Sequence, residues 1–142
     1  MTVADRTEIW AWHYEPPYDF YDSDVSDDEG FAHHPERHFA ARGDDGSLVG
    51  FFYFESKGEV LEYGLGLRPD LTGRRLGLDF FRTGLEFGRG RFRPALVRLY
   101  VAAFNERAVT VYERAGFRET GRHVRTFSRW GDVEFIEMDE QR

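Results

Sequence analysis

The sequence predicts a single domain of the α/β (α+β) class, a twisted, mixed and mostly antiparallel sheet flanked by helices. Residues 64–117 read as strand, loop, helix, strand and helix without interruption. Two β-rich segments joined by turns precede this stretch, and two more follow it. At 142 residues the chain fits one domain that can bury roughly two thirds of its unfolded surface.

The amino-acid composition excludes several classes of function for this protein. Cysteine is absent, which excludes disulfides, thiolate metal ligands and a cysteine nucleophile, and is consistent with a reducing compartment. The formal net charge of -7 argues against general affinity for nucleic acid, so an arginine-mediated nucleic-acid binder is not expected. The N-terminus is acidic, and no apolar run approaches the ~20 residues of a membrane span. We therefore expect a soluble cytoplasmic protein with no membrane partner.

The first helix is predicted from its own capping residues. Thr2 followed by Asp5 resembles a capping box, and Pro16 must stop the helical pattern that follows. Residues 14–29 are aromatic and acidic, which favours turns and loops. Four aromatic residues there have two open interpretations, capping the core or lining a substrate mouth: Tyr14, Tyr18, Phe20 and Tyr21.

A histidine-rich segment at residues 33–38 raises the question of a metal site. His34 and His38 are four residues apart, but Pro35 breaks the helix that would align them. No carboxylate stands at an established ligand spacing. We therefore predict a solvated turn and no metal.

Three strands are predicted before the central helix. Residues 38–42 and 48–55 form an antiparallel hairpin around the Asp-Asp-Gly turn at 44–46. Residues 59–68 form the next strand, with Leu61 and Tyr63 on one face and Glu62, Gly64 and Gly66 on the other. Two glycines on one face indicate a bulge, or a place where another backbone or a ligand comes close.

The helix predicted from Leu76 carries glycines on its apolar face. Gly77, Gly84 and Gly88 each cost roughly 1 kcal/mol against alanine, which indicates close approach to a sheet or a ligand. The helix is expected to end within residues 90–94. A strand at residues 95–103 follows, then a helix at 106–115 capped by Asn105, and finally strands at 117–127 and 133–138 around a turn at 130–132.

Two pieces of the central stretch carry candidate chemistry. The glycine-containing loop before the helix offers free backbone N–H groups and a positive helix dipole to an anion, although it could equally be an ordinary helix entry. Asn105 and Tyr112 are seven residues apart, which puts them on nearly the same helix face, about 10 Å apart along the axis. Tyr112 could face the core, or donate a proton to a leaving group beside an anion site.

These segments resemble the GNAT superfamily of acetyl-CoA-dependent N-acetyltransferases over residues 12–125. The matching parts are LEYGLGLRPDLTGRRLGLDF and LYVAAFNERAVTVYERAGF, the second being the more specific. The resemblance implies an N-acetyltransferase that moves the acetyl group of acetyl-CoA directly to a primary amine, in a small molecule or a protein N-terminus. The alternative is a non-catalytic acyl-CoA-binding or regulatory module.

The resemblance also implies roles for individual residues. The loop and helix start would cradle the pyrophosphate through Gly73, Arg74, Arg75, Leu76, Gly77 and Leu78. The preceding strand would pair with the pantetheine arm through Leu65, Gly66 and Leu67. Asn105 would bind that arm, and Tyr112 would protonate the departing thiolate. For the base that deprotonates the amine, the candidates are Glu62, an ordered water and, in reserve, Glu55.

The chain departs from the family pattern in two places. At the three positions that define the family's loop, this sequence has Thr72, Arg75 and Gly77. The family usually has glycine at the position of Arg75. The family also usually begins with a strand, whereas this sequence begins with a helix pattern, so the first strand is missing or improvised. The exposed sheet edge that results could be covered by a partner, which allows a homodimer. The acidic segment 19–29 could attract a cationic amine or be a solvated loop.

Overall fold

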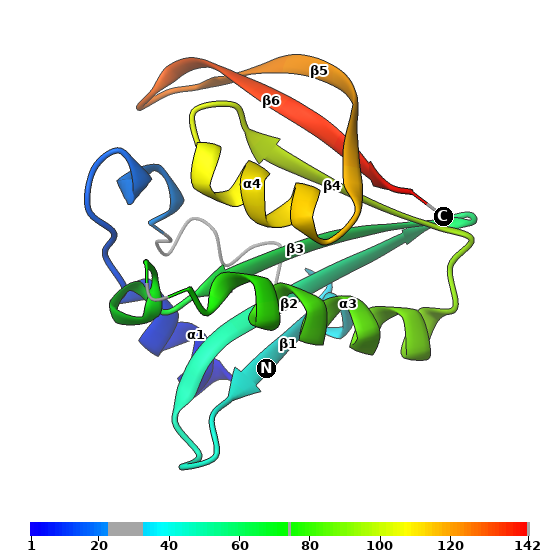
Figure 1. Cartoon of the computed structure of the whole chain (residues 1–142). Coiled ribbons are helices and arrows are strands. Elements are labelled where there is room, and N and C mark those ends of the chain that lie inside the picture. Colours follow the sequence, from blue (N-terminus) through cyan, green and yellow to red (C-terminus); the bar gives the residue numbers. More distant parts are fainter. Residues whose placement is uncertain (23–32, 74, 142) are drawn as a thin grey trace.

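The computed structural model describes residues 1–22, 33–73 and 75–141 (Figure 1). Their sheet has six strands in the order β1-β2-β3-β4-β6-β5, in which only β3 and β4 are parallel. The strands are β1 (His38–Arg42), β2 (Leu48–Lys57), β3 (Val60–Leu67), β4 (Leu96–Ala102), β5 (Phe117–Phe127) and β6 (Gly131–Glu140). The α-helices are α1 (Val3–Trp10), α3 (Gly77–Phe92) and α4 (Glu106–Arg114), and the 3-10 helices are η1 (Tyr18–Tyr21), η3 (Pro35–Arg37) and η4 (Pro69–Leu71). The predicted fold class is confirmed.

Helix α1 forms as its capping residues predict. The Thr2 hydroxyl accepts from the Asp5 N–H at 3.1 Å, and the Asp5 carboxylate accepts from the Thr2 N–H at 2.9 Å. Ile9 and Trp12 pack on Leu48 in a small apolar cluster separate from the main core. Within the described residues no strand precedes β1, so β1 forms one edge of the sheet. No helix in that part of the chain is long and apolar enough to cross a membrane.

Helix α3 lies directly against the sheet, as its glycines predict. A Cβ atom at Gly84 would lie 2.2 Å from the Tyr63 hydroxyl oxygen, and one at Gly88 would lie 2.5 Å from the Phe54 ring. Both distances are too short for any side chain. The helix ends at Phe92, within the predicted range, where Arg93 takes a left-handed conformation with φ 49°.

The glycines of β3 lie opposite aromatic side chains of β2 and not in a bulge. A Cβ atom at Gly66 would lie 2.3 Å from the Phe51 ring, and one at Gly64 would lie 3.6 Å from Tyr53. The pairing of β2 with β3 runs without a register shift, so the suggested bulge is wrong. Gly66 thus makes room for the Phe51 ring, whereas the contact between Gly64 and Tyr53 is an ordinary van der Waals contact.

The C-terminal strands form a long hairpin at the opposite edge of the sheet (Figure 1). Its turn lies at residues 128–130, two residues earlier than predicted, because Gly131 with φ 73° already begins β6. The core lies between the sheet and helices α3 and α4, and its fully buried members are Phe54, Leu61, Phe81, Val97, Leu99, Phe117 and Met138. The hairpin therefore extends the sheet beyond β4, the strand that borders the candidate site.

Candidate active site

The two parallel strands separate at their carboxyl ends. β3 and β4 pair only through residues 60–62 and 96–98. Beyond these pairs the backbones diverge (Figure 1), and we call this divergence, between residues 63–67 and 99–102, the splay. Backbone N–H and C=O groups along such an edge need partners. An extended ligand with amide groups can supply them.

The loop from β3 to α3 ends in an uncapped helix N-terminus. Gly73 and Arg75 have positive φ angles of 75° and 61°, and among the described residues no side chain caps the helix at Leu76. The first N–H groups of α3, at Gly77 and Leu78, therefore lie at the positive end of the helix dipole. Arg74 lies outside the described residues. This loop has the features of an anion site.

Arg107 is a candidate binding residue that the sequence interpretation did not assign. Its Nη1 atom would lie 3.6 Å from a Cβ atom at Gly73, so its guanidinium borders the loop. Its position two residues after the helix cap Asn105 was the available signal. A guanidinium beside free N–H groups suits a phosphate.

Arg75 leads to a first prediction. A non-glycine residue in the left-handed region costs about 1–2 kcal/mol, while glycine costs about 0.5–1 kcal/mol in unfolded-state entropy. We expect Arg75→Gly to raise the free energy of unfolding by about 0.5 kcal/mol. Under the phosphate-binding role that the family resemblance implies for Arg75, the substitution should also raise the KM for acetyl-CoA about threefold to tenfold, because that cation is lost. Thermal denaturation and steady-state kinetics test both, and a clear loss of stability would contradict the assigned backbone strain.

Asn105 and Tyr112 lie on α4, which follows β4 directly. The Asn105 Oδ1 atom accepts from the Ala108 N–H at 3.2 Å, so the predicted cap is confirmed, and Nδ2 donates to the Tyr21 hydroxyl at 3.1 Å. The Tyr112 ring packs 4.7 Å from the Phe81 ring. Burial raises the pKa of Tyr112, so its hydroxyl stays protonated at neutral pH. A protonated phenol is suited to donate a proton.

The cap that Asn105 forms and the cofactor-binding role that the family resemblance implies for it can be tested separately. We expect Asn105→Ala to remove the cap and lower the free energy of unfolding by about 1 kcal/mol. Asn105→Asp keeps an oxygen acceptor for the Ala108 N–H and loses the Nδ2 donor, so stability should be retained. Acetyl-CoA affinity should fall in both variants. Denaturant unfolding and calorimetric titration measure the two properties, and full affinity in Asn105→Asp would exclude the donor role.

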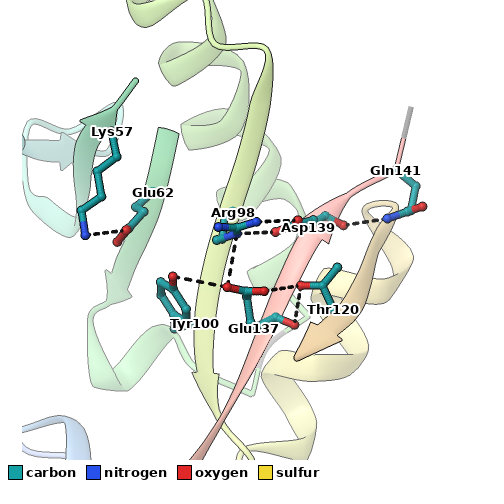
Figure 2. A network of polar contacts seen from close by, with 8 residues as sticks. All are labelled: Lys57, Glu62, Arg98, Tyr100, Thr120, Glu137, Asp139 and Gln141. Atoms are coloured by element: carbon teal, nitrogen blue, oxygen red, sulfur yellow. Dashed lines mark hydrogen bonds and ion pairs between the residues drawn. The ribbon is translucent and has the colours of Figure 1, made fainter. Parts of the chain in front are cut away.

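Glu62 lies where the paired part of β3 ends and the splay begins. Its carboxylate forms an ion pair with Lys57 at 3.0 Å, and its side chain is only 15% exposed. Figure 2 shows it beside a polar network on β4 and β6, in which Arg98 binds Asp139 at 2.8 Å and Tyr100 donates to Glu137 at 3.5 Å. The position at the closed end of the splay fits the base predicted from the sequence.

Glu55 is placed less favourably for a base. The Tyr53 hydroxyl donates to its carboxylate at 2.8 Å, and Arg37 lies 3.4 Å away. These contacts, the Tyr53 hydrogen bond first, hold the pKa of Glu55 below its usual value. A lowered pKa makes a carboxylate a weaker base, which argues against Glu55 in this role.

A segment that we call the strap, residues 14–22, spans the open end of the splay. The Tyr14 hydroxyl donates to the carbonyl of Leu67 at the end of β3, at 2.7 Å. The Tyr18 ring lies under the Arg107 guanidinium at 4.2 Å, and Tyr21 reaches Asn105. The strap thus contacts both sides of the splay, which supports the substrate-mouth interpretation of its aromatic residues.

A cavity of about 430 Å³ lies between the strap and the loop that precedes α3. Its lining combines aromatic rings with groups of both charges: His13, Tyr14, Glu15, Tyr18, Pro69, Asp70, Thr72 and Arg107. A cavity of this size is within the range of small-molecule sites. Through Arg107 it joins the anion site at the start of α3.

The histidine-rich segment shows no metal geometry. The His38 ring contacts the His34 carbonyl at 3.2 Å, and His34 lies 3.4 Å from Glu36. Across residues 1–22, 33–73 and 75–141, no group of three or more His, Cys, Asp or Glu side chains is arranged to hold a metal ion.

Comparison with known proteins places these features in a family. The model of the acetyltransferase (GNAT) family matches residues 4–117. The mycothiol acetyltransferase of Streptomyces coelicolor is 38% identical over 112 residues, covering 61% of this chain and 35% of that protein. The mycothiol acetyltransferase of Acidothermus cellulolyticus is 33% identical over 147 residues, covering 90% of this chain and 41% of that protein. The chain thus spans less than half the length of these relatives.

Solved structures share the fold. A chimera of the spermidine N-acetyltransferase SpeG from Vibrio cholerae and hSSAT superposes with a TM-score of 0.75 at 21% identity, covering 99% of this chain and 93% of that one. The spermidine/spermine N-acetyltransferase SpeG from Vibrio cholerae superposes with a TM-score of 0.74 at 20% identity, covering 98% of this chain and 88% of that one. With most of its length matched by the family model, the chain belongs to the GNAT family of acetyltransferases.

Proposed function

We propose that this protein is an N-acetyltransferase that moves an acetyl group from acetyl-CoA directly to a primary amine. The observation that carries the proposal is the splay itself, with an uncapped helix N-terminus at α3 and, on α4, the donor Asn105 and the protonated Tyr112. The family match and the named relatives support the same reaction class.

The residues present fit acetyl-CoA. The N–H groups at the start of α3, together with Arg107, suit a pyrophosphate. The edge of β3 at Leu65, Gly66 and Leu67 suits an amide-containing pantetheine arm, because residues 63–67 have no partner on β4. The Nδ2 atom of Asn105 supplies a hydrogen-bond donor on the β4 side of the splay.

The chemistry requires two proton transfers that the chain can perform. Bound acetyl-CoA supplies a thioester whose carbonyl carbon is attacked by the amine nitrogen, so that a C–N bond forms and the C–S bond breaks. Tyr112 gives its proton to the leaving sulfur. Glu62, directly or through a water, takes the proton that the amine loses. No covalent enzyme intermediate is needed, in keeping with the absence of cysteine.

The acceptor is assigned only as a primary amine. Proteins similar to this chain are named mycothiol acetyltransferase and spermidine N-acetyltransferase. The acidic segment 19–29, for which attraction of a cationic amine and a solvated loop are the two alternatives, lies mostly within residues 23–32, outside the described part of the chain.

The proposal is tested by calorimetric titration with acetyl-CoA and CoA, followed by a thiol-release screen against polyamines, aminoglycosides and peptides with free N-termini. We expect acetyl-CoA binding and acetylation of at least one amine class. Binding without turnover on any amine would instead favour the non-catalytic acyl-CoA-binding module or an acceptor outside the screen. Absence of acetyl-CoA binding would refute both.

A further inference from the structure

The donor that a pantetheine arm would use on Asn105 is already engaged. Asn105 uses its Oδ1 atom for the α4 cap, so Nδ2 is the part of the amide that can bind a ligand. That nitrogen donates to the Tyr21 hydroxyl at 3.1 Å, although 84 residues separate the two in sequence. Any ligand group that takes the same donor has to share it with Tyr21 or displace it.

Tyr21 also reaches the end of β4, which borders the splay. Burial raises the pKa of the Tyr21 phenol, and hydrogen bonds from Asn105 and from the Ala102 backbone partly offset that rise. A Tyr21 phenolate would raise the pKa of Tyr112. Tyr21 thus lies at two of the groups that the proposed reaction uses, the β4 edge and Asn105.

The strap that carries Tyr21 is tied at its base and tip. At the base, Asp22 accepts from the Tyr14 N–H at 2.8 Å and contacts the His13 ring at 3.1 Å, which closes residues 13–22 into a loop. At the tip, Phe20 packs edge-on against Phe104, Phe127 and Trp130 at 5.1–5.9 Å. The Tyr21 hydroxyl is therefore held at Asn105 by contacts that do not involve a ligand.

We propose that Tyr21 occupies the pantetheine subsite of the ligand-free protein, so that the strap and acetyl-CoA compete for the Asn105 amide. The proposal rests on the proposed function. When acetyl-CoA binds, the strap leaves Asn105. Binding of the cofactor is thereby coupled to the position of the aromatic residues at the substrate mouth. Removing the Tyr21 hydroxyl removes the competitor and keeps the ring.

The test is the affinity for acetyl-CoA of Tyr21→Phe, measured by calorimetry. Tyr21→Phe removes a hydrogen bond that acetyl-CoA would otherwise have to break. The affinity for acetyl-CoA should therefore rise about threefold to tenfold. Tyr53→Phe is the matched control, because it also deletes a tyrosine hydroxyl that hydrogen bonds a side chain, Glu55, and should leave the affinity unchanged. In an Asn105→Ala background, Tyr21→Phe should have no effect, because the shared donor is gone.

A second readout follows the contact itself. Asn105 is the only asparagine and Gln141 the only glutamine of the chain, so a ¹⁵N spectrum has just two side-chain amide pairs. In the ligand-free protein, Tyr21→Phe should shift the Asn105 pair and leave the Gln141 pair in place. Equal or weaker acetyl-CoA binding by Tyr21→Phe, or an unmoved Asn105 pair, would overturn the proposal. If the wild-type protein binds no acetyl-CoA, the proposed function fails first.

Discussion

Tyr112→Phe is expected to lower kcat roughly 10²-fold, the low end of what a positioned general acid contributes. The ring and its packing on Phe81 remain, and only the hydroxyl is lost. Acetyl-CoA affinity and the melting temperature should therefore stay close to the wild-type values. Steady-state thiol release gives kcat, and calorimetry gives the affinity.

The pH profile adds a check on the same residue. Burial raises the pKa of Tyr112 above its ordinary value of 10.0, so the phenol keeps its proton below that pH. Wild-type kcat should show no decline due to loss of this proton between pH 7 and about 10. If Tyr112→Phe retains full activity at every pH, the hydroxyl is not the acid.

Gly84→Ala is expected to destabilise the protein by about 2 kcal/mol and lower Tm by roughly 6 °C. The new methyl group would meet the Tyr63 hydroxyl at 2.2 Å and the Phe52 ring at 2.5 Å. Moving Tyr63 would break its hydrogen bond to the carbonyl of Phe81, which is 2.8 Å long and buried. These costs exceed the roughly 1 kcal/mol that alanine gains in helix propensity. Differential scanning calorimetry measures the change.

Gly90→Ala is the matched control on the same helix. A Cβ atom at Gly90 has nothing within 4 Å, and the residue is exposed inside α3. The substitution should therefore stabilise the protein by about 0.5–1 kcal/mol. Opposite signs at the two positions are the expected result. Equal stabilisation at both would mean that α3 does not press on the sheet at Gly84.

The parts of the site that depend on local chemistry were predictable from sequence. The Asn105 cap is set by a side chain and an N–H three residues away, so its spacing is visible in the chain. The close approach of α3 was visible at Gly84, because glycines at helical spacing on an apolar face indicate tight packing against a neighbouring element. In β3 the same reasoning left the neighbour of Gly66 open, since a missing Cβ does not reveal that Phe51 fills the space.

The parts that depend on distant contacts were not predictable. The strap reaches β3 through Tyr14 and Leu67, 53 residues apart, and α4 through Tyr21 and Asn105. Nothing in the local sequence determines such pairs, so the strap could be described only as turns and loops with two possible roles. The position of Arg107 beside Gly73 follows in the same way from how α4 packs next to α3.

The most direct test of the account is the response of the Asn105 side-chain amide to acetyl-CoA. In a ¹⁵N-labelled sample the Asn105 and Gln141 amide pairs are the only two of their kind, and Gln141 contacts Asp139 near the C-terminal end of β6 (Figure 2). We predict that titration with acetyl-CoA shifts the Asn105 pair in a saturable manner and leaves the Gln141 pair unmoved. Saturable binding of acetyl-CoA with the Asn105 pair unchanged would contradict the placement of the cofactor in the splay.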